Sequence, residues 1–156
     1  REEPLWARHV YVDENGSFGW KANGWEAAAL QEELKDEAVV AWLRNFPRKS
    51  RSLCVPYDFG GQHKGLYPDM IVFRLIEGRL VVDILDPHDP GRDEAVEKAK
   101  GLAAYAEKHG DQFGRIQLIA LDKNDTIRRL DVNLPGVREK VKRLESSPQL
   151  KALFGE

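Results

Sequence analysis

The chain has almost no cysteine, since Cys54 is the single one among its 156 residues. One thiol cannot close an internal disulfide, and it cannot supply the several thiolates that hold a structural zinc ion or an iron–sulfur cluster. A chain without disulfides is typical of a reducing compartment, so we expect a cytoplasmic protein.

Long apolar runs and an excess of one charge are also lacking. No apolar stretch reaches the roughly 18 residues that a membrane-spanning helix needs, and the first residues do not resemble a secretion signal. The 24 lysines and arginines nearly balance the 26 acidic residues, which gives a formal net charge of -2. Such a chain has no overall attraction for membranes or nucleic acids, so any anion must be bound by a local group of residues.

Two common catalytic signatures are missing as well. Gly60 and Gly61 precede Lys64 and Gly65, but the Gly-Lys-Ser/Thr sequence of a phosphate-binding Walker loop does not follow. The serine, histidine and aspartate residues are not gathered into a nucleophile elbow. We therefore expect neither ATP hydrolysis nor serine-hydrolase chemistry from this chain.

What the chain does contain fits one globular domain. A protein of this length can bury roughly 70% of its unfolded surface, and 42% apolar with 32% charged residues is ordinary for a soluble domain. The first residue is Arg1 rather than methionine, which suggests a fragment of a larger protein. We predict a single domain over residues 1–156, with an N-terminal hairpin in 1–23, a core in 24–122, and a C-terminal strand and helices in 123–156.

Periodicity and turn signals predict a mixture of helices and strands. An Asn-Gly turn at residues 15–16 predicts the opening hairpin, and the Ala, Glu and Leu content of residues 25–45 predicts one long helix or two short ones. Strands are predicted at residues 52–57, 70–76, 79–85, 115–121 and 127–132, helices at 93–109, 135–146 and 148–154, and a glycine-rich loop at 59–65. This order predicts an α/β fold, with a mixed sheet covered by helices on both faces.

The most informative stretch is Tyr67-Pro68-Asp69, which leads into a predicted hairpin whose second strand carries Asp83. Carboxylates on neighbouring strands can hold a hard divalent cation, and such a cation can activate water against a phosphodiester. An ionised Asp83 inside an apolar strand is costly unless it meets a cation or a buried arginine or lysine. Asp69 and Asp83 are candidate metal ligands, with a strand-opening role and a buried ion pair as their respective alternatives.

The spacing of the two aspartates sets a condition on the hairpin. Asp83 lies opposite Asp69 only if the connecting loop is centred near Ile76, whereas Glu77 and Gly78 are the better turn residues. We therefore expect a bulge or a longer turn to absorb the difference.

Several ordered features resemble the PD-(D/E)XK nuclease superfamily, and more narrowly the nuclease-like C-terminal domain of type III restriction subunits and superfamily 2 helicases. In those domains a glutamate-bearing helix ends in a Trp and Lys/Arg-Asn pattern, a strand ends near Pro-Tyr, and Tyr-Pro-Asp leads into the hairpin. The matching residues here are Glu26, Trp42-Leu43-Arg44-Asn45, Val55-Pro56-Tyr57 and Tyr67-Pro68-Asp69. The resemblance covers residues 24–122 and implies a restriction-endonuclease-like core in the order αβββαβ.

The resemblance also implies a metal site. Asp69, Asp83 and a helix glutamate would hold Mg²⁺, for which Mn²⁺ could substitute. The helix glutamate would be Glu26 or Glu33, which lie two turns apart on a similar face; both could instead be solvated helix charges.

The basic group of the superfamily has no direct match at its expected position. Leu85 falls where a lysine is expected, and Lys98 or Lys100 on the following helix could replace that lysine, although solvated lysines are the alternative. His88 could ligate metal or contact phosphate, with an ordinary surface-loop histidine as the alternative.

A local group of basic residues could contact DNA phosphates on a chain of negative net charge. Solubility alone would also explain these residues, which are Arg44, Arg48, Lys49, Arg51 and Lys64. The four tryptophans are interpreted as packing residues rather than as platforms for nucleic acid bases.

Two functions follow as hypotheses. The first is a nuclease-derived domain of a helicase or restriction-type protein that acts on or braces DNA, with weak or no cleavage because Leu85 replaces the lysine. The alternative is an active Mg²⁺-dependent DNA endonuclease in which Lys98 or Lys100 supplies the charge. DNA and the helicase domains of the same parent chain are the expected partners, and any ATPase activity would reside in those domains.

Overall fold

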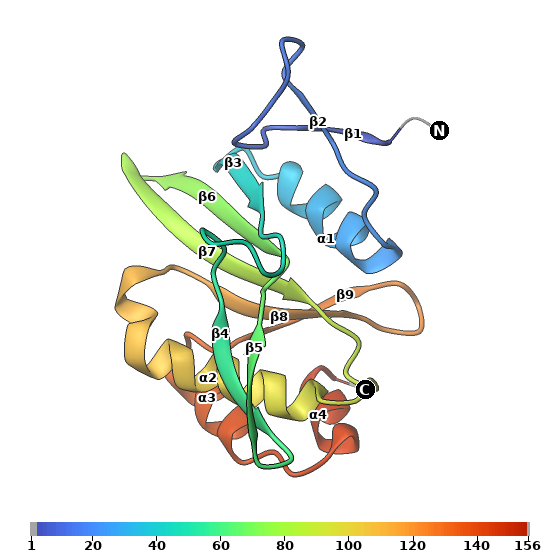
Figure 1. Ribbon diagram of the computed structural model, residues 1–156, viewed down its shortest axis with the longest axis vertical. Helices are drawn as coiled ribbons and strands as arrows, with labels where there is room; N and C mark the ends of the chain where they lie inside the picture. Colours follow the sequence, from blue (N-terminus) through green and yellow to red (C-terminus); the bar gives the residue numbers. More distant parts are fainter. Residues whose placement is uncertain (1–2, 156) are drawn as a thin grey trace.

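A mixed sheet of five strands forms the centre of the protein (Figure 1). The computed structural model describes residues 3–155. The strand order is β3-β6-β7-β8-β9, and all neighbours are antiparallel except β7 and β8. Helix α2 (Ala95–His109) makes the long crossover that these two parallel strands require. The strands are β3 (Val39–Arg44), β6 (Met70–Ile76), β7 (Arg79–Pro87), β8 (Ile116–Leu121) and β9 (Ile127–Asp131).

Helix α1 (Gly24–Leu34) covers one face of the sheet. A capping box fixes its start: the Asn23 side chain accepts the backbone N–H of Glu26, and the Glu26 side chain accepts the backbone N–H of Asn23, both at 2.8 Å. The helix then buries its apolar stripe against the sheet. The core on this side contains Trp20, Ala29, Leu30, Val39, Trp42, Met70, Val72, Leu85 and Ile119.

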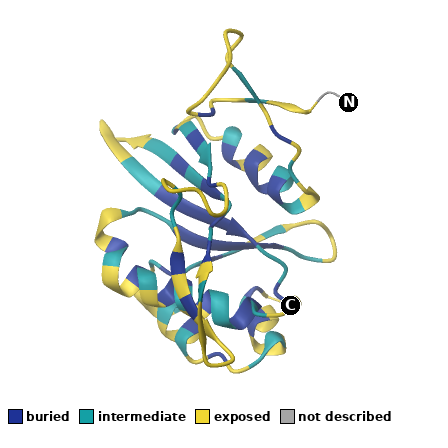
Figure 2. Ribbon diagram, in the orientation of Figure 1, coloured by how far each residue is buried: buried dark blue, intermediate teal, exposed yellow. Residues whose placement is uncertain are grey.

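Helix α2 covers the other face, with the short helices α3 (Pro135–Lys142) and α4 (Ser147–Leu153) beside it. A separate hairpin of β4 (Val55–Phe59) and β5 (Gln62–Leu66) packs on α2. This packing is close, because a Cβ on Gly101 would lie 2.5 Å from the Cβ of Tyr57. Figure 2 shows that buried residues concentrate along β7, β8 and the inner side of α2.

The elements α1, β3, β6, β7, α2 and β8 follow the order αβββαβ. The predicted fold class is therefore confirmed as an α/β protein with the core order αβββαβ, a mixed sheet between helices, an N-terminal hairpin and C-terminal helices.

The prediction of helix throughout residues 25–45 is wrong in its second half. Helix α1 ends at Leu34, and the segment that carries Trp42-Leu43-Arg44 is the strand β3. A turn near Asp36 separates the two elements, because the Asp36 side chain accepts the Ala38 N–H at 2.9 Å. The β-branched pair at residues 39–40 and the buried Trp42 then favour a strand.

The strand expected at residues 52–57 begins at Val55 and belongs to the β4–β5 hairpin rather than to the main sheet. The expected glycine-rich loop is largely the strand β5. Its turn is formed by Gly60 and Gly61, which have φ values of 56° and 77°. The first core strand is therefore β3.

The N-terminal hairpin, β1 (Leu5–Ala7) and β2 (Ser17–Gly19), is present and docks beside β3. The Trp42 indole N–H donates to the Ala7 carbonyl at 2.8 Å, and the His9 ring stacks on Phe18 with centroids 3.5 Å apart. All four tryptophans are buried or packed against a core, which confirms their packing role.

The register of β6 and β7 decides which residues meet at the site. Glu77 and Gly78 form the turn, with φ values of 50° and 77°, and the ladder pairs Met70 with Leu85 without a bulge. The expectation of a bulge is wrong. The next position outward therefore brings Asp69 beside Asp86 rather than Asp83.

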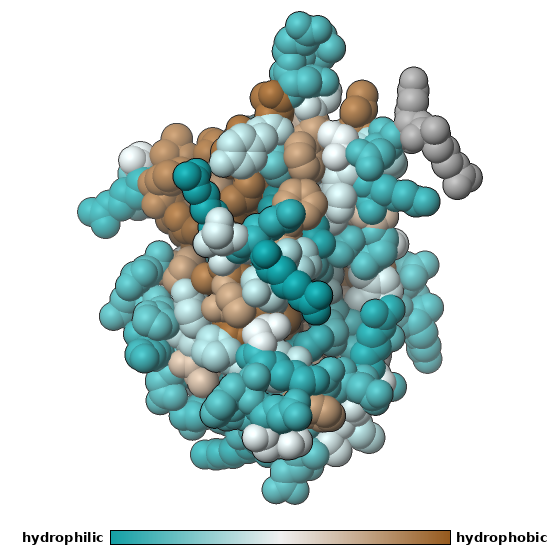
Figure 3. All heavy atoms as spheres, viewed as in Figure 1, coloured by the Kyte–Doolittle hydropathy of each residue, from teal (hydrophilic) through white to brown (hydrophobic). Residues whose placement is uncertain are grey.

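The far end of the β6–β7 hairpin carries apolar side chains that are open to solvent. Figure 3 shows an apolar area over this hairpin, where Leu75 and Leu80 are 49% and 62% exposed. No helix among residues 3–155 is both long and apolar enough to cross a bilayer.

Candidate active site

Asp83 takes part in a buried ion pair. Its neighbour across the ladder is Val72, its side chain is 0% exposed, and it accepts five hydrogen bonds from Arg74 and Arg115. The Nη2 of Arg115 lies 2.8 Å from Asp83 Oδ2. The prediction that Asp83 faces Asp69 is wrong, because the one-to-one ladder carries it inward and two guanidinium groups occupy its oxygens.

Glu33 belongs to the same charge network. Its two oxygens accept hydrogen bonds from Arg115 and Arg129 at 2.8–2.9 Å, which ties α1 to the residue before β8 and to β9. Of the two candidate helix glutamates, the structure therefore places Glu33 in a structural network and leaves Glu26 near Asp69.

Asp69 and Asp86 are the two carboxylates that lie next to each other, at the end of the β6–β7 ladder. The Asp69 backbone N–H donates to Asp86 Oδ1 at 3.2 Å, and Asp86 is only 3% exposed. Both residues line a cavity of about 340 Å³ between the start of α1, the start of β6 and the end of β7. We call this cavity the acidic pocket; its acidic and basic lining residues are Glu26, Asp69, Asp86, His88, Arg92 and Lys98.

The acidic pocket brings the carboxylates of Glu26, Asp69 and Asp86 together where they are largely buried from solvent. Burial, followed by the charge of Glu26, raises the pKa of Asp69 to about 6. Burial, followed by the charge of Asp69, raises the pKa of Asp86 well above its usual value. A cation that entered the pocket would relieve both effects.

Arg44 is the cation that the structure places at this cluster. Its Nη1 lies 3.1 Å from Asp69 Oδ1, and its Nη2 lies 4.0 Å from Glu26 Oε1. The same Nη1 also donates to the backbone carbonyls of Asn45 and Asp69. Arg44 was predicted to contact DNA, but its side chain is 12% exposed and its donors point inward.

The acidic pocket is not a finished metal site. Within residues 3–155, no three His, Cys, Asp or Glu side chains already surround one point at metal-binding distances. The donor set nonetheless suits a hard divalent cation, since Asp86 Oδ2 is buried without a hydrogen-bond partner and carboxylate oxygens are the preferred ligands. If the Asp69 side chain rotated away from Arg44 and into the pocket, Asp69 and Asp86 together would offer two carboxylate ligands to the cation.

His88 and Lys98 face the two carboxylates. Burial, followed by the charges of Lys98 and Arg92, lowers the pKa of His88 to about 4, so the ring is neutral at pH 7. Its Nε2 is buried without a hydrogen-bond partner. His88 follows Asp86 by two residues on the same wall of the pocket, while Lys98 offers an ammonium from α2.

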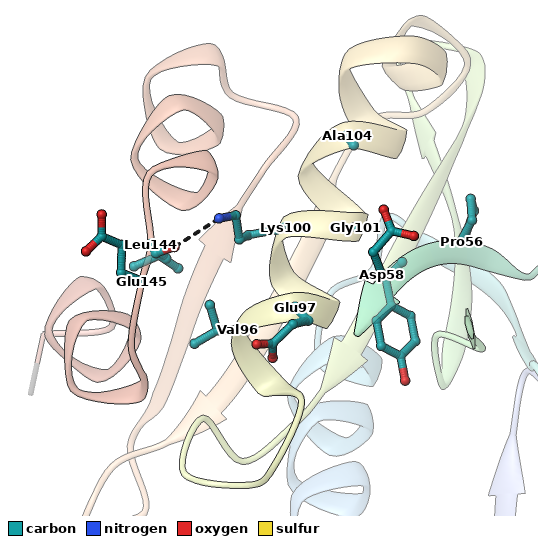
Figure 4. Close-up of a pocket in the computed structure, with 10 residues that line it drawn as sticks. Pro56, Asp58, Val96, Glu97, Lys100, Gly101, Ala104, Leu144 and Glu145 are labelled. Carbon is teal, nitrogen blue, oxygen red and sulfur yellow. Dashed lines mark hydrogen bonds between the residues drawn. The ribbon is translucent and has the colours of Figure 1, made fainter. Parts of the chain in front are cut away.

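Lys100 and Leu85 lie outside the acidic pocket. Lys100 is on the other side of α2 and donates to the Leu144 carbonyl at 3.0 Å, as Figure 4 shows. Leu85 is 0% exposed in the core beneath α1. The role of Leu85 as the replacement for a lysine stays a prediction.

The remaining predicted DNA contacts lie at the surface. Arg48, Lys49 and Arg51 are exposed in the loop between β3 and β4, and Lys64 is half-buried on β5. Lys64 pairs with Glu94 at 2.7 Å.

The sequence did carry a signal for Asp86. Glu77-Gly78 is a good two-residue turn, and a ladder built from it ends at Met70 and Leu85, so that Asp69 and Asp86 are the next residues outward. Asp83 was the stronger candidate because its neighbours in sequence are apolar. Its partners are Arg74 on β6 and Arg115 before β8, and the sequence alone does not show that these arginines contact it.

Comparisons with known proteins place the chain in a family. A family model described as the YagJ family matches residues 7–156. Protein YagJ of Escherichia coli (strain K12) is 34% identical over 148 residues, which are 94% of this chain and 60% of that protein. The chain thus spans well under two thirds of that relative's length, and no solved structure matches it. The chain belongs to the YagJ family.

Proposed function

We propose that this domain is a Mg²⁺-dependent DNA endonuclease of the PD-(D/E)XK type. The observation that carries the proposal is the pair Asp69 and Asp86, which meets at the start of the central hairpin in a pocket shared with Glu26 and Lys98. This arrangement has the acids on a strand opening, a strand end and a helix, as the superfamily pattern requires.

The residues of the acidic pocket fit the chemistry of phosphodiester hydrolysis. Asp69, Asp86 and Glu26 would hold the metal ion, which supplies a Lewis acid and an activated water when bound. The Lys98 ammonium can stabilise charge that develops on the phosphate oxygens. The neutral His88 ring can hold or release a proton at Nε2.

The two lysines of α2 provide a matched test. The wild-type domain should cut plasmid and oligonucleotide DNA with Mg²⁺ or Mn²⁺ but not with a chelator. Lys98→Ala should slow cutting by about a hundredfold, because one preorganised charge at a developing anion has about that effect. Lys100→Ala should cut at the wild-type rate, since its ammonium contacts the Leu144 carbonyl.

Two outcomes of this gel assay contradict the proposal. One is the absence of any metal-dependent cutting. The other is equal rates for Lys98→Ala and Lys100→Ala, which would remove Lys98 from the site.

One observation favours a second candidate, a nuclease-derived module that binds DNA without cutting it. The Arg44 guanidinium lies 3.1 Å from Asp69 Oδ1 and 4.0 Å from Glu26 Oε1. It therefore already balances the negative charge that a metal ion would otherwise balance. In this case Arg44→Gln should leave DNA binding unchanged and produce no cleavage. For the endonuclease, the same substitution should strengthen metal binding by freeing Asp69.

A further inference from the structure

A second cavity adjoins the acidic pocket. It has a volume of about 410 Å³ and is lined by Arg48, Tyr57, Lys64, Gly65 and Tyr67. Gly65 and Tyr67 line both cavities, so the two lie on either side of the strand end that leads to Asp69. We call it the basic cavity. The two cavities therefore share a wall formed by Gly65 and Tyr67.

The loop that presents Arg48 is held at its base. The Asn45 side chain, 2% exposed, donates to the Leu53 carbonyl at 2.9 Å and accepts the Leu53 N–H at 2.8 Å. Ser52 closes the loop further by donating to the Phe46 carbonyl. These hydrogen bonds hold the loop in one conformation before any ligand binds.

Arg48 itself has an unfavourable backbone conformation, with φ at 60°. A side chain other than glycine, asparagine or aspartate is uncommon there, and such strain clusters where a residue serves a ligand. Arg48 forms no ion pair within residues 3–155. Its guanidinium is thus a free cation at the wall of the basic cavity.

The other groups of the basic cavity suit a nucleotide. The Lys64 charge is shared with Glu94, which also accepts the Tyr57 hydroxyl at 3.0 Å, so Arg48 leaves the cavity with a net positive charge. Tyr67 is half-buried at the boundary of the two cavities. An aromatic face beside a cationic group is the usual platform for one base and its phosphate.

We propose that the basic cavity binds one nucleotide of a single DNA strand, next to the phosphate held in the acidic pocket. Tyr67 stacks on the base, and Arg48 pairs with the adjoining phosphate. The base must leave a duplex to reach this ring, so the preferred substrate is a single-stranded segment or a frayed end. The inference rests on the proposed nuclease function for the phosphate position.

The test is binding without metal. A fluorescent oligo-dT of about twelve nucleotides, long enough for one strand site, is titrated in chelator and low salt, and its anisotropy is compared with that of the matched duplex. The single strand should bind tighter. Tyr67→Leu and Arg48→Gly should each weaken the affinity for the single strand about tenfold. Tyr67→Phe, which keeps the aromatic ring, should bind the single strand as the wild type does.

The variants are chosen to keep the fold. Arg48→Gly relieves the left-handed strain, so a loss of binding is not a loss of structure. Lys140→Ala, at an exposed position of α3, controls for a simple loss of positive charge. Equal binding of duplex and single strand, or equal effects of Arg48→Gly and Lys140→Ala, would overturn the inference.

The two proposals fail separately. Single-strand binding that depends on Tyr67, without metal-dependent cleavage, would refute the endonuclease and keep the basic cavity. Cleavage that depends on Lys98, with Tyr67→Leu binding the strand as wild type, would refute the basic cavity and keep the endonuclease.

Discussion

Replacing Asp83 by asparagine should destabilise the domain by about 3–5 kcal/mol, because it removes one charge from a buried pair and leaves guanidinium groups without a counter-charge. Asp83 is fully buried and accepts five hydrogen bonds from Arg74 and Arg115. The network continues through Arg115 to Glu33, so the substitution also loosens α1 from the sheet. Urea unfolding, followed by tryptophan fluorescence, measures the loss.

The same substitution at Asp86 should have the opposite sign in the metal-free protein. Burial, followed by the charge of Asp69, raises the pKa of Asp86, so the folded state disfavours its ionised form relative to the unfolded chain, and at neutral pH this carboxyl group costs stability. Replacing it with a neutral amide should stabilise the fold by about 1 kcal/mol, as commonly happens when an active-site residue is replaced. A destabilisation by Asp86→Asn as large as that of Asp83→Asn would assign Asp86 a purely structural role.

Loss of either pocket aspartate should reduce DNA cleavage by about a thousandfold or more, because the metal ion contributes several kcal/mol to the transition state. Asp69→Asn and Asp86→Asn act on the same ion, so the double variant should be no slower than the single ones. Initial rates on a radiolabelled oligonucleotide at saturating Mg²⁺ measure this effect.

Asp125→Asn is the matched control for this loss. Asp125 is exposed in the turn between β8 and β9, and its positive φ of 57° is one that asparagine adopts readily. The Asp125→Asn variant should cleave DNA at the wild-type rate. If Asp86→Asn also cut at the wild-type rate, Asp86 would not be part of a catalytic site.

Local patterns predicted most of the central sheet. The strand at residues 70–76 and the start of the next at Arg79 follow from alternating apolar residues around Glu77-Gly78, and the long helix at 93–109 follows from its charged ends. The strand β3 was missed because Ala, Trp, Leu and Arg are also good helix residues. Its identity depends on burial of Trp42 between α1 and the N-terminal hairpin, a tertiary effect that overrides propensity.

The site was only half predictable. Asp69 follows from the Pro-Asp pair at the mouth of a hairpin, and Glu26 from the helix that precedes it. Choosing Asp86 over Asp83 needs the register, and the register also reveals that Asp83 meets Arg115, which is distant in sequence and becomes a neighbour only through the parallel pairing of β7 with β8. No local pattern contains that contact.

Calorimetric titration of Mn²⁺ into the wild-type domain and Asp86→Asn tests the central claim most directly. The wild type should bind one ion at a pH of about 7.5, and its affinity should fall steeply below a pH of about 6, where protons compete for the Asp69 carboxylate. Asp86→Asn should lose this binding while remaining folded. Binding of Mn²⁺ by Asp86→Asn with the wild-type affinity, or no binding by the wild type at millimolar metal, would contradict the assignment of Asp69 and Asp86 as a metal-binding pair.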